Sequence, residues 1–108
     1  MPTRRRMISE ALAVWDTEGM TITGVYIEKG TFQQMRDGRP VDVAKYTLKN
    51  DVATIIVNGT YDIDAAMARV EIGETVEITY KGEAVTSAGF KVKKFEVAVH
   101  EEYTEGGE

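Results

Sequence analysis

The chain has 108 residues, of which 43% are hydrophobic and 29% charged, a composition that predicts one folded domain with one core. It contains no cysteine and one histidine, which excludes disulfides, cysteine-ligated zinc and multi-histidine metal sites, so we expect no cofactor. The formal net charge of -5 at first disfavours a nucleic-acid ligand.

The N-terminal residues do not predict membrane insertion or export. No stretch approaches the roughly 20 apolar residues of a transmembrane helix. A short apolar run follows Arg4, Arg5 and Arg6, but Glu10 interrupts it and no small-residue cleavage site comes after it. We therefore expect a cytoplasmic protein.

The first half of the chain predicts three strands. Residues 20–29 are rich in β-branched residues, and Gly24 within them predicts a bulge or a tight bend. Residues 30–39 are expected to form a loop. Residues 41–49 alternate between apolar and polar positions, a turn follows, and residues 52–57 then complete a hairpin.

One internal segment predicts a helix of about two turns. Asp62 or Asp64 is a candidate cap, and Ile63, Met67 and Val70 share one apolar stripe at helical spacing. Capping explains the two aspartates without invoking an acid–base pair. With no catalytic motif in the sequence, we expect no enzymatic activity.

The second half predicts two further strands. Residues 75–81 alternate between a buried and a wet face. Residues 90–99 alternate as well, but the phase changes at Lys93 and Lys94, which predicts a β-bulge at that point.

The order of these elements predicts an all-β fold. Five strands with one short helix between the third and fourth are typical of the OB-fold, a five-stranded Greek-key barrel. The expected domain covers residues 16–100. It is preceded by an N-terminal extension, residues 1–15, and followed by a disordered acidic tail, residues 101–108.

The charges are sorted along the sequence. Four of the 18 acidic residues lie in the last eight positions, and another group spans residues 50–80 around the helix. Residues 29–49 and 81–94 are basic. In an OB-fold these two segments flank the ligand groove, with the acidic helix expected at the far end. The candidate phosphate-binding residues are Lys29, Arg36, Arg39, Lys45, Lys49, Lys81, Lys91 and Lys93.

Aromatic side chains are the second requirement for binding single strands, because bases stack on them. Phe32 and Tyr26 are the stacking candidates. Tyr46, Tyr80 and Phe95 fall on apolar faces and are expected in the core. Trp15 is also expected to be a packing residue, and Tyr61 to pack at the helix start.

Three segments carry a family resemblance: Thr21–Lys29, Val70–Gly82 and Gly89–Val97. In this order they resemble the small OB-fold single-stranded DNA-binding proteins of bacteriophages, over roughly residues 15–99. The resemblance implies sequence-independent binding of single-stranded DNA during phage DNA replication, recombination or repair in a bacterial host. It also implies replication or recombination proteins as partners of the acidic tail, and a homodimer is a further candidate assembly.

Two alternatives remain open from the sequence. The basic residues are also compatible with a solvated strand face or with protection of an edge strand, in which case the domain would be a protein–protein interaction or assembly module. An oligosaccharide-binding domain would need more exposed aromatic and amide side chains than this sequence offers. The residue types do not distinguish DNA from RNA.

Overall fold

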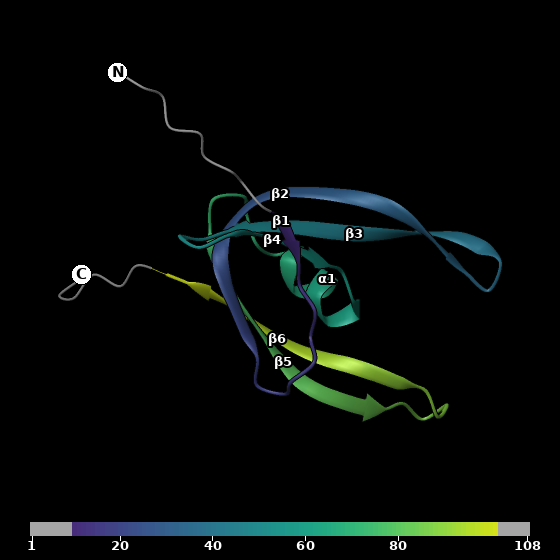
Figure 1. The fold of residues 1–108 in the computed structure, drawn as a ribbon. Helices are drawn as coiled ribbons and strands as arrows, with labels where there is room; N and C mark the ends of the chain where they lie inside the picture. Colours follow the sequence, from purple (N-terminus) through teal and green to yellow (C-terminus); the bar gives the residue numbers. More distant parts are fainter. Residues whose placement is uncertain (1–9, 102–108) are drawn as a thin grey trace, which may run out of the picture.

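Six strands and one helix make up residues 10–101, the part of the chain that this computed structural model describes (Figure 1). In chain order the elements are β1 Glu10–Leu12, β2 Thr21–Arg36, β3 Arg39–Lys49, β4 Thr54–Asn58, α1 Tyr61–Met67, β5 Thr75–Val85 and β6 Lys91–His100.

The strands form a single sheet in the order β1-β4-β3-β2-β5-β6. β2 lies between β3 and β5 because its first five residues, Thr21–Val25, pair with β5 while Val25–Arg36 pairs with β3. The sheet curls around α1 as a half-barrel (Figure 1). The expected all-β, barrel-like architecture is confirmed. The expected five-stranded barrel is not, because the described sheet has six strands and ends at β1 and β6 as a half-barrel.

The additional strand, β1, comes from the segment expected to lie outside the domain. β1 runs parallel to β4, with Glu10 opposite Thr54 and Leu12 opposite Ile56. Three residues carry too little periodicity to be recognised as a strand in a sequence. Trp15 follows and is buried, as expected. The folded unit therefore includes residues 10–15.

The predicted loop at residues 30–39 is wrong. This segment is the tip of a long β2–β3 hairpin: it contains the end of β2, a two-residue turn and the first residue of β3. Asp37 and Gly38 make the turn, with positive φ angles of 51° and 75°. An Asp-Gly pair with positive φ at both positions suits a two-residue hairpin because its twist matches that of the strands. Strand pairing accordingly extends to Arg36 opposite Arg39.

Both predicted bulges exist, but on other residues. In β2 the extra residue is Ile27, because the pairing shifts between Tyr26 and Glu28, rather than Gly24. In the β5–β6 ladder the bulge lies on β5, where two residues, Lys81 and Gly82, stand opposite the single residue Lys94. Gly82 lies in that bulge with a φ of 90°, a conformation that glycine adopts without steric cost.

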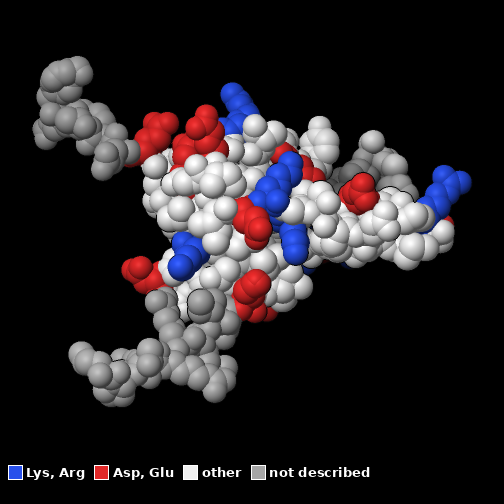
Figure 2. All heavy atoms as spheres, turned by 90° about the horizontal axis from the view of Figure 1, so that it is seen from above, with Lys and Arg blue, Asp and Glu red and all other residues white. Residues whose placement is uncertain are grey.

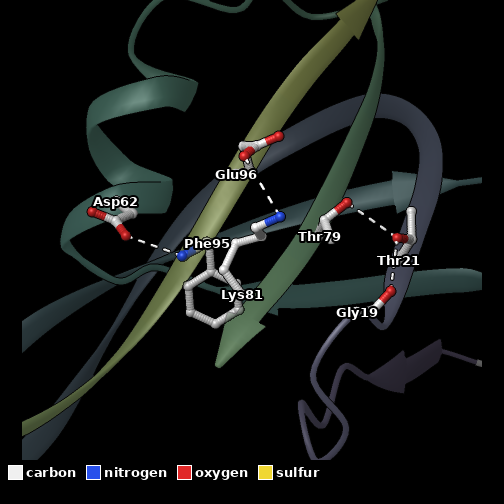
Figure 3. A network of polar contacts seen from close by, with 7 residues as sticks. All are labelled: Gly19, Thr21, Asp62, Thr79, Lys81, Phe95 and Glu96. Atoms are coloured by element: carbon white, nitrogen blue, oxygen red, sulfur yellow. Dashed lines mark hydrogen bonds and ion pairs between the residues drawn. The ribbon is translucent and has the colours of Figure 1, made fainter. Parts of the chain in front are cut away.

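The helix begins differently from the prediction. Thr60 is the cap, and its hydroxyl accepts the backbone N–H of Ile63 at 3.3 Å. The two aspartates instead tie α1 to the sheet. Asp62 accepts the backbone N–H of Phe95 at 3.0 Å (Figure 3), and Asp64 accepts the Tyr46 hydroxyl at 2.7 Å.

The core lies between the curled sheet and the helix. Ile63 and Met67 are buried on the predicted helical stripe, with Val70 packed against them. The core positions of Tyr46, Tyr80 and Phe95 are confirmed. Phe95 links two rings: its centroid lies 5.1 Å from that of Trp15 in an edge-on arrangement and 5.4 Å from that of Tyr80, favourable aromatic geometries.

Candidate nucleic-acid interface

A groove of about 430 Å³ lies where the β2–β3 hairpin, the start of α1 and the start of β6 meet. It follows the edge of β3 beyond the point where β4 stops pairing, at Lys45 opposite Asn58. We call it the hairpin groove. Its lining residues are Arg36, Val41, Asp42, Val43, Gly59, Thr60, Tyr61, Asp64, Val92 and Lys93.

A hydrogen-bonded pair anchors the helix at this groove. The Tyr46 hydroxyl donates to Asp64 at 2.7 Å, and the Tyr26 ring packs edge-on against Tyr46 at 5.9 Å. Burial, followed by the hydrogen bond to Asp64, raises the pKa of Tyr46 well above its ordinary value. The phenol therefore stays protonated and keeps donating, which holds the helix start in place beside β3.

Two basic residues reach the hairpin groove from opposite sides. Arg36 comes from the end of β2, where Gln34 accepts from its guanidinium at 3.2 Å and 3.3 Å. Lys93 comes from β6, where its ammonium donates to the Trp15 carbonyl at 3.0 Å and lies 5.6 Å from the Tyr80 ring centroid. Both side chains retain donors for an anionic ligand.

A third lysine lies on the same face of the sheet as the core. Cross-strand partners share a face, and Lys29 pairs with Tyr46, whose ring lies 5.8 Å from the Lys29 ammonium. Lys29 itself is exposed. Arg39 and Lys91 lie at the hairpin ends, opposite Arg36 and Val85 respectively.

The remaining predicted lysines lie on the opposite, convex face of the sheet. Lys45 packs over Gly30, and Lys49 lines a separate shallow hollow beside Val25 and Ile27. Lys81 pairs with Glu96 at 3.8 Å (Figure 3). The two basic sequence segments thus do not converge on one surface, because alternate residues of a strand face opposite sides.

The aromatic candidates also differ from the prediction. Tyr26 is only 4% exposed, so this core ring offers no face to a base. Phe32 is half-buried, opposite Val43. Tyr61 is 88% exposed and lines the hairpin groove, and Phe90 is 69% exposed just before β6.

The sequence carried a signal for Tyr61. This residue lies off the buried stripe of Ile63, Met67 and Val70, so its side chain must point away from the core. Phe90 directly follows Gly89, which has a φ of 88°, and therefore lies in a hairpin loop rather than on a buried strand face.

Acidic residues accompany the basic ones. On the face seen in Figure 2, basic and acidic side chains are interspersed. Asp42 and Asp64 both line the hairpin groove, so the acidic helix does not lie at the far end as expected. Its N-terminal end meets the groove because Tyr46 and Phe95 each hold one of its aspartates.

Two further features of the described residues bear on the kind of site. Within residues 10–101 there is no cluster of three or more His, Asp or Glu side chains able to hold a metal ion. The same residues include no helix long and apolar enough to cross a membrane. The acidic tail expected at residues 101–108 lies outside the described residues, except for Glu101.

Comparison with protein-family models, with curated proteins and with solved structures finds no match for this chain.

Proposed function

We propose that the hairpin groove binds single-stranded DNA without sequence preference, as part of DNA replication, recombination or repair. The observation that carries the proposal is the combination of an exposed aromatic ring, Tyr61, with the cationic groups of Arg36 and Lys93 in one groove. Aromatic faces stack on any base, and cations follow the phosphate backbone. Such a groove would bind a single strand whatever its sequence.

The proposed binding mode uses residues from three elements. Tyr61 stacks on a base at the helix start, and Phe90 and Phe32 extend the stacking surface along the two hairpins. Arg36 and Lys93 hold phosphates on either side, with Lys91 beyond Lys93. This arrangement resembles the ligand groove of an OB-fold, where the strand 1–2 and 4–5 loops flank the bound strand.

Binding to oligo-dT of about 20 nucleotides, a length that exceeds the site of one OB-fold, tests the proposal. Tyr61→Leu should weaken binding by about 5- to 150-fold, the range expected for loss of one stacked base. Tyr61→Phe keeps the ring and should retain wild-type affinity. Equal affinity of wild-type protein and Tyr61→Leu would contradict the proposed site.

The same titration with RNA and with duplex DNA defines the ligand. We expect duplex DNA to bind much more weakly, because its paired bases cannot stack on Tyr61. Equal binding of duplex and single strands would contradict the stacking mode.

A protein–protein interaction module is the second candidate. Asp42 and Asp64 in the groove, and the interspersed charges in Figure 2, favour it. It predicts that oligo-dT does not bind even at low salt, whereas the nucleic-acid proposal predicts tightest binding there.

A further inference from the structure

The two edges of the sheet differ in how they are protected against pairing with another strand. β6 carries lysines at positions 91, 93 and 94, and Asp62 already accepts the edge-facing N–H of Phe95. Lysines and blocked backbone groups are devices that keep edge strands apart. The β6 edge is therefore guarded.

Among its described residues the β1 edge has no lysine and no blocked backbone group, and Glu10 is its one charged side chain. Glu10, Ala11 and Leu12 are all exposed, and the chain continues through Ala13 and Val14 without a lysine or proline. Leu12 is 56% exposed and Val14 is 62% exposed. An exposed edge with apolar side chains is a surface for strand pairing.

No backbone group of residues 10–101 pairs with the outer edge of β1. The Ala13 N–H donates to the Ile56 carbonyl at 2.8 Å, so the backbone groups of Ala13 point toward β4. Because direction alternates along a strand, the N–H and C=O groups of Glu10, Leu12 and Val14 point toward the free edge. The Leu12 side chain shares the face of Ile56, its cross-strand partner.

We infer that this edge pairs with the same edge of a second copy of the chain, antiparallel about a two-fold axis at Leu12. Leu12 would then exchange two hydrogen bonds with Leu12 of the partner subunit, and Glu10 would face Val14 of the partner subunit. In an antiparallel pair, two opposite residues exchange hydrogen bonds only if their backbone groups point toward each other. Glu10, Leu12 and Val14 meet this condition.

The side chains are compatible with the same axis. Two copies would bring Leu12, Val14 and Ile56 of each subunit into one apolar cluster on a continuous sheet. Glu10 would face valine, so no like charges would oppose each other across the axis. A surface that complements itself under two-fold symmetry is what a homodimer needs. The inference does not depend on the proposed DNA binding.

The molar mass in solution, from light scattering without DNA, tests the inference. We expect a dimer for the wild-type protein. Leu12→Asp would place two carboxylates opposite each other and remove the central apolar contact, so the dimer dissociation constant should rise by about 100-fold or more. Ile72→Asp, a matched change at another exposed apolar residue, should leave it unchanged.

A cysteine variant tests the geometry independently. The protein has no cysteine of its own, so in Leu12→Cys a disulfide can form only between copies. Residues paired directly across antiparallel strands lie about 5.5 Å apart at Cα, within disulfide range. Mild oxidation should give covalent dimers for Leu12→Cys and few for Ile72→Cys. A monomeric wild-type mass, or equal cross-linking of both variants, would overturn the inference.

Discussion

At the scale of single residues, the side chains that were hardest to assign from sequence are those that join the helix to the sheet. Asp62 and Asp64 have the spacing of helix caps, yet they accept from Phe95 and Tyr46. Both bonds connect residues far apart in the chain, so no local sequence pattern encodes them. The buried aromatics, by contrast, follow from strand alternation.

The Tyr46 hydroxyl should contribute measurably to stability. Tyr46→Phe removes the hydrogen bond to Asp64, and we expect the free energy of unfolding to fall by about 1–2 kcal/mol. Denaturant unfolding measures the change. Tyr61→Phe removes a hydroxyl from a ring that is 88% exposed and should leave stability unaltered; an equal loss in both variants would contradict the role of the bond.

Asp62 should give the protein a stability that depends on pH. The Phe95 N–H and then Lys94 hold the pKa of Asp62 below its ordinary value of 3.8, against the effect of burial. Since the folded pKa is the lower one, this stabilisation is present above pH 3.8 and is lost as the pH falls through the folded pKa.

Unfolding measured from pH 7 down to the acid limb checks this dependence. In Asp62→Asn the free energy of unfolding should fall less steeply below pH 3.8 than in the wild-type protein. In Asp51→Asn, a change in an exposed turn, it should fall as in the wild-type protein. An unchanged pH profile in Asp62→Asn would show that the carboxylate bond is not what the acid removes.

At the scale of elements, sequence periodicity predicted five of the strand positions and the helix, but not how far the strands extend. The errors lie at the two hairpins: β2 and β3 meet at Asp37 and Gly38, and β5 continues past Gly82 to Val85. Both extensions protrude beyond the core, so they lack the apolar alternation that identifies a half-buried strand. β1 was missed because three residues have no measurable period.

The β2–β3 turn should be sensitive at one position. Gly38→Ala places a side chain at a φ of 75° and should cost about 1–2 kcal/mol, with weaker oligo-dT binding because Arg36 lies at the hairpin end. Asp37→Asn is the control, since asparagine tolerates positive φ. Hydrogen exchange of the hairpin amides would show the change; unaltered protection in Gly38→Ala would contradict it.

The candidate site was predictable only in part at this scale. The sequence identified the basic segments and their position relative to the strands, but a bulge at Ile27 and another opposite Lys94 decide which lysines share a face. Lys93 and Arg36 line the groove, while Lys45, Lys49 and Lys81 do not. Arg36 and Lys45 share one side of the hairpin, so the position of Arg36 near the turn, and not its face, brings it to the groove.

At the scale of the whole molecule, an acidic protein is proposed to bind a polyanion, so the salt dependence of binding is informative. Two phosphate contacts, from Arg36 and Lys93, predict a slope of log affinity against log salt of about -1.4 for a single strand. Arg36→Gln should reduce its magnitude by about 0.7. Lys81→Gln, on the convex face, should leave the slope unchanged, and the reverse result would place the DNA on that face.

The most direct test of the hairpin groove as the binding site is a map of backbone amide chemical shifts during titration with oligo-dT. We predict that the largest changes fall on residues 36–43, 59–64 and 90–93, which surround the groove. Shifts confined to the convex face around Lys45, Lys49 and Lys81, or no shifts at low salt, would contradict it.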